Sequence, residues 1–468
     1  MPERPTLGDL KPYPEYKESG LPWLGRIPAH WTLRRAKYLY REVDERSQTG
    51  EEELCSVSHK TGVTPRKENV TMFMAESTVG YKICRPNDLA INTLWAWMAA
   101  LGVARQVGVV SPAYGVYRPL PGSELLPDFA DRLLRIEEYK SEYIARSTGV
   151  NASRLRLYPD QFLRIPVLLP TREEQEQIAR YLEGMDRSVR RFIRNRRRLI
   201  EVLNEQKQAI INRAVTRGLD PNVPLKPSGV EWLGEIPAHW VSRRLKFLVQ
   251  NVNEQTATRQ PNEVYIALEH VEGWTGRVTL PSEDIAFDSQ VKRFRAGDVL
   301  FGKLRPYLAK VTRPSIPGVC VGEFLVLRVK DAALRPEYLE QELRSKQFID
   351  IINSSTCGAK MPRADWTFIG NLLIVYPPTE VEQQEIVSAI GRQTQALQSS
   401  IDRAKREIDL VREYRTRLIA DVVTGKVDVR HLAPTEPLPA EPEADIEDET
   451  TPEDTETEPG EEAANDVD

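Results

Sequence analysis

The chain of 468 residues carries 64 Lys and Arg against 69 Asp and Glu, and 40% of its residues are hydrophobic. This hydrophobic content excludes a wholly disordered chain, and the length suggests about three domains. About 15 of the acidic residues follow residue 433, where no Lys or Arg occurs. The formal net charge of −5 therefore conceals a basic body of net charge about +10, which distinguishes the chain from a mildly acidic enzyme.

Several classes of protein are excluded by composition. No apolar run approaches the roughly 18–20 residues of a membrane span, and the first residues lack the apolar segment of a secretory signal. The four cysteines, Cys55, Cys84, Cys320 and Cys357, contain no Cys-x-x-Cys pair, so neither a disulfide scaffold nor a zinc spacing is present. We expect a soluble cytoplasmic protein without a membrane partner.

The first recognisable element is a block at residues 17–39 that recurs at residues 226–248. About 15 of the 23 positions are identical, which chance does not produce. The mixed segment after the first block alternates short β-type runs with a helical stretch at 127–147. It predicts a compact α+β domain over residues 1–169.

A long helix is predicted next, over residues 170–218. Thr171 and Glu174 form a capping-box pattern at its start. The apolar side chains then follow a 4–3 spacing typical of a coiled-coil seam. The seam residues are Ile178, Leu182, Met185, Val189, Phe192, Leu199, Leu203 and Ile210.

The second half of the chain repeats this order. A second α+β domain is predicted over 219–377, with a helical stretch at 336–354, and a second long helix over 378–432. The motif at 378–386 matches the one at 170–178, although the domains between the repeated blocks share only faint similarities. The β-type runs of this second domain are Val264–Leu268, Asp298–Phe301, Val319–Val329 and Leu372–Tyr376.

The predicted architecture is therefore α+β: two globular domains separated by two long α-helices, in a pseudo-twofold internal repeat. Helices of about 45 residues rarely stand alone; a general dimerisation coiled coil is one interpretation, and an antiparallel pair within the chain is the other. The internal repeat favours the antiparallel pair.

The acidic tail, residues 433–468, is rich in Pro, Glu, Asp and Thr and is expected to be disordered. The repeated blocks and helices form one scaffold, and the two domains between them have diverged. This organisation suits a protein that recognises two different targets at a fixed separation.

The search for catalytic motifs yields no constellation that we would assign. Tyr376-Pro-Pro-Thr379 lacks the amide and the aromatic residue of an amino-methyltransferase loop and is better explained as a strand end before a helix. Gly425-Lys426 lacks the remainder of a phosphate loop and is interpreted as a helix C-cap. Asp160 is too far in sequence from Glu205 and Lys207 for a nuclease motif. His30 and His239 occupy equivalent positions beside tryptophans and are interpreted as packing and hydrogen-bonding residues.

Basic segments are better represented than catalytic ones. Arg187–Arg198 concentrates positive charge on the first long helix, and three turn-rich loops at 60–67, 301–310 and 358–363 carry further Lys and Arg. Each segment alone could be an ordinary solvated surface. Together, on a basic body, they favour nucleic acid, because phosphates require Lys or Arg and base edges require Arg, Lys, Asn or Gln. The residues predicted to contact DNA are His59, Lys60, Arg66, Lys67, Lys303, Arg305, Tyr307, Lys360 and Arg363.

These features together resemble the specificity subunit of type I restriction–modification systems, over about residues 15–430. The resemblance is carried by the duplicated Trp-Leu-Gly-x-Ile-Pro-Ala-His-Trp blocks, the Gly297–Tyr307 loop, Glu323–Arg328, the Ser-Thr-x-Gly turns and the two helix starts. It implies that each globular domain is a target recognition domain that reads one half of a split double-stranded DNA site, and that the two helices set the spacer between the halves.

The same resemblance implies partners that perform the catalysis. Two modification subunits would methylate adenine with S-adenosylmethionine, and restriction subunits would add translocation and cleavage driven by ATP with Mg²⁺. This chain would bind no cofactor or metal itself. A departure from the family pattern is Asn92–Trp97, which replaces Lys-Leu-Arg-Pro-Tyr in the first domain. The alternatives are a self-contained DNA methyltransferase or nuclease, and a coiled-coil scaffold that binds no DNA.

Overall fold

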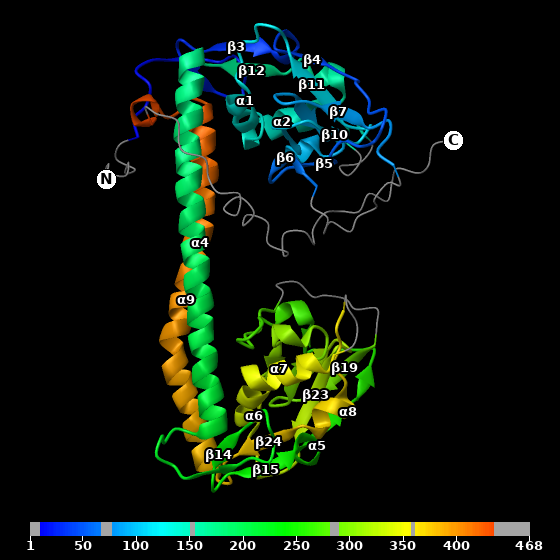
Figure 1. Ribbon diagram of the computed structural model, residues 1–468, viewed down its shortest axis with the longest axis vertical. Helices are drawn as coiled ribbons and strands as arrows, with labels where there is room; N and C mark the ends of the chain where they lie inside the picture. The colour runs from blue at the N-terminus through cyan, green and yellow to red at the C-terminus, as the bar shows by residue number, and fades with distance from the viewer. Residues whose placement is uncertain (1–9, 67–76, 150–154, 281–289, 357–360, 435–468) are drawn as a thin grey trace. The chain divides into compact units, whose positions relative to one another are not determined.

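The computed structural model describes residues 10–66, 77–149, 155–280, 290–356 and 361–434 (Figure 1). The chain divides into two compact units: unit 1 comprises residues 1–195 and 407–468, and unit 2 comprises residues 196–406. Each unit combines one mixed helix-and-strand part with one half of each long helix, α4 (Arg172–Arg217) and α9 (Glu380–Val423). The predicted domain boundaries stay a prediction.

Unit 1 contains twelve named strands within the described residues. They are β1 (Tyr16–Glu18), β2 (Arg26–Pro28), β3 (Thr32–Arg35), β4 (Tyr40–Glu42), β5 (Cys55–Ser58), β6 (Gly62–Pro65), β7 (Lys82–Cys84), β8 (Leu89–Ile91), β9 (Leu101–Val103), β10 (Gly108–Val110), β11 (Gly115–Pro119) and β12 (Pro166–Leu169). The largest sheet is antiparallel in the order β4-β11-β8-β9. Strand β12 pairs with β3 and leads directly into α4, so the sheet pair fixes the start of the long helix.

Unit 2 repeats this plan, with a second four-stranded sheet where unit 1 has two-stranded pairs. Its strands are β13 (Leu225–Pro227), β14 (Glu235–Pro237), β15 (Val241–Arg244), β16 (Val249–Val252), β17 (Gln255–Thr256), β18 (Val264–Ile266), β19 (Val291–Phe294), β20 (Val299–Gly302), β21 (Val311–Thr312), β22 (Gly318–Cys320), β23 (Phe324–Val329) and β24 (Leu373–Tyr376). The sheet β16-β23-β20-β21 matches β4-β11-β8-β9, and β15–β24 matches β3–β12. The second four-stranded sheet has the order β17-β19-β22-β18.

The short helices differ from the sequence prediction. The stretch predicted to be helical over 127–147 is helical but consists of two helices. These are α1 (Pro127–Leu133) and α2 (Glu137–Arg146), and they are separate because Ile136 takes an extended conformation before α2. The helix expected over 336–354 likewise divides into α6 (Pro336–Leu343) and α7 (Lys346–Ser354), where Ser345 caps α7 through the backbone N–H of Phe348. The remaining short helices are α3 (Pro159–Phe162), α5 (Leu245–Leu248) and α8 (Trp366–Asn371), with 3-10 turns at Ala36–Tyr38, Ala96–Met98, Leu268–His270, Pro306–Leu308 and Arg430–Leu432.

The strand predicted over Val319–Val329 is divided into two strands, β22 and β23. A turn closed by the bond from the Phe324 N–H to the Val321 carbonyl (3.1 Å) separates β22 from β23, and the two strands belong to different sheets. The reading of Tyr376-Pro-Pro-Thr379 is confirmed, since β24 ends at Tyr376 and α9 begins at Glu380.

An equivalent buried ion pair supports the central sheet of each unit. In unit 1 the Arg118 guanidinium donates to both oxygens of the Asp88 carboxylate, at 3.0 and 2.9 Å. In unit 2 Arg328 does the same to Asp298, at 2.9 and 2.6 Å. Two bidentate pairs at corresponding strands show that the weak sequence similarity between the mixed parts reflects one shared frame.

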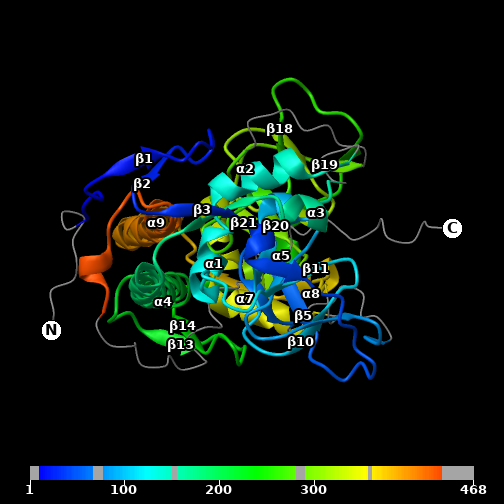
Figure 2. The same ribbon diagram turned by 90° about the horizontal axis from the view of Figure 1, so that it is seen from above.

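The two long helices pack side by side and antiparallel within each unit (Figure 1 and Figure 2). In unit 1, Arg415 Nε of α9 lies 2.7 Å from Asp186 Oδ1 of α4, and in unit 2, Lys207 Nζ of α4 lies 2.6 Å from Gln398 Oε1 of α9. The residue numbers rise along one helix and fall along the other, which confirms the predicted antiparallel pair. The predicted seam is wrong at Leu199, whose side chain is exposed.

Each long helix is also anchored to its own mixed part. The Gln175 side chain accepts a bond from the Leu126 N–H (2.8 Å) and donates to the Glu124 carbonyl (3.0 Å). Gln383 at the start of α9 makes the equivalent bonds to the Arg335 N–H (2.8 Å) and the Ala333 carbonyl (2.7 Å). These fully satisfied buried amides fix how each helix leaves its domain.

The C-terminal end of α9 closes unit 1. Gly425 has φ 77°, and the Lys426 N–H returns to the Asp421 carbonyl at 2.8 Å, which confirms the predicted helix C-cap. The chain then passes the N-terminal segment, where the Asp428 N–H bonds the Lys11 carbonyl at 2.7 Å. Four side chains from this end enter the core that residues 13–182 otherwise build: Leu418, Val422, Val423 and Val429.

Within the described residues, no helix is both long enough and apolar enough to cross a membrane.

Candidate nucleic-acid interface

The loop after β20 has a specific backbone geometry. Arg305 takes a left-handed conformation (φ 49°), the chain makes a 3-10 turn over Pro306–Leu308, and Ala309 is again left-handed (φ 47°). The Gly302 N–H bonds the Lys310 carbonyl at 2.9 Å and closes the loop. Because non-glycine residues rarely adopt positive φ, two such positions in five residues indicate a shape that the surrounding structure enforces.

A second segment, far along the chain, lies against this loop. The Arg305 N–H bonds the Pro362 carbonyl at 2.8 Å, and the Ala364 N–H bonds the Lys303 carbonyl at 2.9 Å. Arg363 therefore stands opposite Leu304 in an isolated β-bridge. Four of the predicted DNA-contacting residues are thus brought together in what we call the loop cluster: Lys303, Arg305, Tyr307 and Arg363.

The loop cluster is positive with partial compensation. Arg363 Nη2 lies 3.0 Å from Glu323 Oε1, whereas the Tyr307 ring projects with 44% of its surface exposed. Asp365 caps α8 by accepting from the Thr367 N–H. Hydrogen bonding from the Thr367 side chain first, with the backbone N–H bonds and the charge of Lys303 as smaller causes, holds the Asp365 pKa below its ordinary value. Burial, and then the charge of Lys303, lowers the pKa of Lys292. The exposed Arg363 and the half-buried Lys303 and Arg305, beside an exposed aromatic ring, are suited to phosphates and bases.

The candidates in unit 1 are placed differently. His59 and Lys60 form the turn between β5 and β6, and their carbonyls accept from Arg135 Nη2 at 3.0 and 2.6 Å. Arg66 follows β6 at the opposite end of the hairpin, with its N–H bonded to the Leu54 carbonyl (2.8 Å). The hairpin separates Arg66 from the turn, and Lys67, like Lys360 of unit 2, lies outside the described residues.

Unit 1 does contain a counterpart of the loop cluster, which the sequence reasoning did not select. Ala99 is left-handed (φ 59°) like Ala309, and the Leu157 N–H bonds the Thr93 carbonyl (3.0 Å) as Ala364 bonds Lys303. Asn92–Trp97 therefore shares part of the loop geometry of Gly302–Tyr307 without its charges. Trp95 differs from Arg305, because it has φ −118° and its N–H bonds the Asn92 carbonyl at 3.1 Å. The pairings in this counterpart are Thr93 with Lys303, Trp95 with Arg305, Trp97 with Tyr307 and Arg156 with Arg363.

Arg156 is the functional candidate that sequence reasoning missed. Its side chain is exposed, and it occupies the position that Arg363 has in unit 2. The signal that could have found Arg156 is a constant offset of 207 residues between the segments that precede β12 and β24. The same offset relates Ile165 to Leu372, whose carbonyls accept the equivalent bonds from the Ala36 and Leu245 N–H groups. The sequences around both arginines have diverged too far for this offset to be read without the fold.

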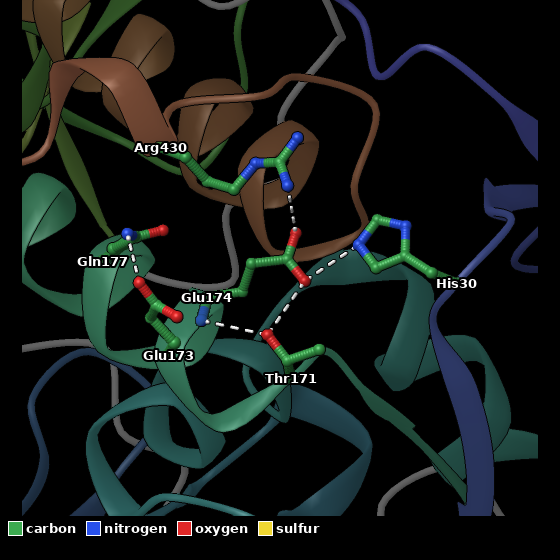
Figure 3. A pocket seen from close by; sticks show the side chains of 6 residues that line it. All are labelled: His30, Thr171, Glu173, Glu174, Gln177 and Arg430. Carbon is green, nitrogen blue, oxygen red and sulfur yellow. Dashed lines mark hydrogen bonds and ion pairs between the residues drawn. The ribbon is translucent and has the colours of Figure 1, made fainter.

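A different hollow, of about 340 Å³, lies beside the start of α4 (Figure 3). Here the buried Glu174 carboxylate is bonded by His30 Nε2 (2.9 Å) and Trp31 Nε1 (3.3 Å), and Arg430 Nη1 lies 3.6 Å away. In unit 2 Glu382 is held in the same way by His239 and Trp240. The two histidines are therefore packing and hydrogen-bonding residues, as predicted, and the hollow is lined by groups that already have partners.

The described residues contain no group of three or more His, Cys, Asp or Glu side chains placed to hold a metal ion. Part of the basic run on α4 is paired along the helix: Arg187 contacts Glu183, and Arg198 Nη1 lies 3.0 Å from Glu201. Those two arginines are thus intrahelical ion-pair partners, which contribute only a few tenths of a kcal/mol each.

No protein-family model matches the chain. It is 24% identical over 246 residues to the type I restriction enzyme EcoDI specificity subunit of Escherichia coli, an alignment covering 48% of this chain and 54% of that protein. It is 23% identical over 316 residues to the type I restriction enzyme MjaVIII specificity subunit of Methanocaldococcus jannaschii, covering 64% and 70%. The chain thus spans about half the length of the first relative and more of the second.

The fold has a solved counterpart. A chain in a structure of the type I R-M system matches with a TM-score of 0.56 at 15% identity, over 85% of this chain and 98% of that one. At this identity the match concerns the fold alone. The sequence relatives and the shared fold together identify this chain as a homologue of the specificity subunits of type I restriction enzymes.

Proposed function

We propose that this chain is the sequence-specific DNA-binding subunit of a type I restriction–modification complex. Each mixed part would read one half of a bipartite double-stranded site. The observation that carries the proposal is the loop cluster and its counterpart, which share several backbone bonds but carry different side chains: Lys303, Arg305 and Tyr307 in one, Thr93, Trp95 and Trp97 in the other. A conserved frame with divergent tips is what two readers of different half-sites require.

The side chains of the loop cluster and of its counterpart are suited to different contacts with DNA. Arg and Lys bind phosphates through charge and guanine edges through paired hydrogen bonds, and Tyr adds an aromatic face. The tryptophans of unit 1 supply no charge, so contacts to phosphate there would depend on neighbours such as Arg156. The two units are therefore expected to differ in salt dependence as well as in base preference.

We further propose that the chain acts without catalysis of its own and positions other subunits in the cytoplasm, where its DNA would be found. The names of its relatives support a multisubunit enzyme. Two modification subunits would dock on the helical regions and methylate adenine with S-adenosylmethionine. Restriction subunits would use ATP and Mg²⁺ for translocation and cleavage.

The loop cluster provides a direct test of DNA recognition. Lys303→Ala or Arg305→Ala should weaken specific binding, by about 1–3 kcal/mol for each lost base-edge contact, and should relax one half-site only. A lost phosphate contact should instead weaken all sequences similarly and reduce the salt slope by about one. Fluorescence anisotropy on oligonucleotides randomised in either half-site, at several salt concentrations, separates the two results.

Two matched variants control this experiment. Arg156→Ala in unit 1 should affect the other half-site, because it occupies the position of Arg363. Arg392→Ala, an exposed cation on α9, should change neither half-site. If Lys303→Ala and Arg305→Ala bind every sequence as the unaltered chain does, the loop cluster is not the interface.

The role of the partners is tested by methylation. The purified chain with DNA and S-adenosylmethionine should transfer no methyl groups, and addition of a modification subunit should produce adenine methylation at a bipartite site. Tritium transfer followed by single-molecule mapping of the product gives both the rate and the site. Methyl transfer by the highly purified chain alone would contradict the proposal and favour a self-contained enzyme.

A further inference from the structure

Unit 1 has a buried triad of charges where α1 meets the long helices. The Asp186 carboxylate on α4 is 5% exposed. Arg132 Nη1 of α1 reaches one of its oxygens at 2.6 Å, and Arg415 Nε of α9 reaches the other at 2.7 Å. A carboxylate bonded on both oxygens by guanidinium groups is the usual way in which a protein buries charge at such a junction.

The internal repeat identifies the equivalent positions in unit 2. Gln175 and Gln383 make the same anchoring bonds near the start of the long helices, and Thr216 and Thr424 bond back to the fourth residue before them near the end. Both pairs are 208 residues apart, while Leu126 and Arg335, at the starts of α1 and α6, are 209 apart. The three members of the triad are then matched by Thr394 for Asp186, Gln341 for Arg132 and Lys207 for Arg415.

Of the triad, unit 2 keeps only the cation at Lys207, because neutral Thr394 and Gln341 replace Asp186 and Arg132. A cavity of about 300 Å³ lies there. This is ample room for a small polyatomic anion. Thr394 does not replace the missing charge, because its hydroxyl donates to the Ile390 carbonyl at 2.7 Å. The polar residues that line the cavity include Lys207, Arg277, Gln341, Arg344, Thr394 and Gln398.

Positive charge in this cavity is incompletely compensated. Lys207 is only 8% exposed, and its ammonium donates to the neutral amide oxygen of Gln398 rather than to a carboxylate. Burial first, and then the charge of Arg344, lowers the pKa of Lys207 to about 8. Buried cations without an anionic partner are costly, so the site stabilises any anion that enters it.

The neighbouring arginines do not remove this imbalance. Arg277 pairs with Asp402 (3.1 Å) and Arg344 with Glu340 (3.3 Å), so these two carboxylates are already engaged. Arg344 is buried, contacts the Thr275 carbonyl through Nη1, and retains a buried Nε–H without a hydrogen-bond partner. A buried guanidinium N–H without a partner, and an ammonium whose hydrogen-bond partner is a neutral amide, both favour an additional acceptor group.

We propose that the cavity between α4, α9 and α6 of unit 2 binds a small oxyanion of the phosphate class, held by Lys207 and Arg344 in the place of the carboxylate that Asp186 supplies in unit 1. The anion completes the triad by which the mixed part is joined to the helix pair. The site is separate from the loop cluster and requires no DNA.

The test is a titration of the full chain with inorganic phosphate, with chloride at equal ionic strength as the reference. Thermal unfolding should show a saturable rise in Tm with phosphate, because a ligand that binds only the folded state stabilises it. The phosphorus NMR line of phosphate should broaden in the same concentration range. Lys207→Gln should weaken this binding by about tenfold or more, as expected for loss of a charged hydrogen bond.

If Lys207→Gln fails to fold, Thr394→Asp tests whether the cavity binds phosphate. It restores the carboxylate of unit 1, so it should abolish the effect of phosphate and should raise the Tm measured in chloride. Arg403→Gln, which removes an exposed cation from the same helix, is the matched control and should leave the phosphate response unchanged. The proposal is overturned if phosphate and chloride act alike on the unaltered chain, or if Thr394→Asp keeps the full phosphate response.

Discussion

Replacing Asp186 with alanine should destabilise the junction of α1 with the two long helices by about 3 kcal/mol. Removal of one member of a buried ionic group leaves the others charged and unpaired, which costs roughly 3–5 kcal/mol. The lower end applies here, because the Arg132 and Arg415 side chains are 20% and 32% exposed and water compensates them in part.

Hydrogen exchange measures this change unit by unit. Peptides from residues 172–195 and 407–423 should exchange faster in the variant, whereas peptides from unit 2 should be unaffected. Thr394→Ala at the equivalent position should cost about 1 kcal/mol or less, because it removes only a hydroxyl that bonds its own helix. Equal protection of both helical segments in Asp186→Ala and the unaltered chain would refute the role of the triad.

The contribution of Asp186 to the free energy of unfolding should be lost at low pH. Burial alone would raise the Asp186 pKa, but Arg132 and Arg415 outweigh burial and hold it below its ordinary value of 3.8. A carboxylate whose pKa is lower in the folded state stabilises the fold above its unfolded pKa and loses that contribution as the pH falls through the folded value. The difference between the variant and the unaltered chain should therefore be full at neutral pH and decrease below about pH 4.

Replacing Glu342 with leucine should have the opposite effect and stabilise unit 2. Glu342 is 1% exposed in α6, one of its carboxyl oxygens has no hydrogen-bond partner, and its position in unit 1 is occupied by the buried Leu133. Burial raises its pKa from 4.5 to about 8. A substitution by leucine should add on the order of 2–4 kcal/mol to the free energy of unfolding at pH 8.

This gain should also vary with pH. Because the folded state holds the proton more tightly than the unfolded state does, the stability of the unaltered chain should fall as the pH rises from about 4.5 to about 8. The variant should lack that decline, so the two urea-denaturation curves should separate progressively with pH. Glu231→Gln, an exposed carboxylate in the same unit, is the control. A pH-independent difference between Glu342→Leu and the unaltered chain would show that Glu342 is ionised in the fold.

Much of the architecture follows from local patterns in the sequence. The repeated blocks and the 4–3 spacing predict two equivalent domains and two long antiparallel helices, and the turn residues near Gly425 predict the helix end. These features depend on residues near one another in the chain, so periodicity reports them directly. Leu199 is exposed, against prediction, whereas Ile193 before it and the polar Lys207 and Gln208 after it are buried, so the buried face of α4 does not keep the strict 4–3 spacing.

Only part of the candidate site could be predicted from the sequence, because its residues are brought together by contacts between distant segments. Lys303, Arg305 and Tyr307 are contiguous and stand out as a basic loop. That Arg363 joins them depends on a β-bridge across about sixty residues, which no local pattern encodes. The counterpart in unit 1 was not selected because its charges are absent, although it keeps the bonds from the Asn92 N–H to the Ala100 carbonyl and from the Leu157 N–H to the Thr93 carbonyl.

The composition of unit 1 from both ends of the chain has a consequence for synthesis on the ribosome. Unit 2 is continuous from residue 196 to residue 406, so all of its parts have emerged before translation ends. The core of unit 1 lacks Leu418, Val422, Val423 and Val429 until the last helix is made, more than two hundred residues after the rest of that core. The first domain to be translated is thus the last to be completed, and its apolar surface needs shielding throughout that interval.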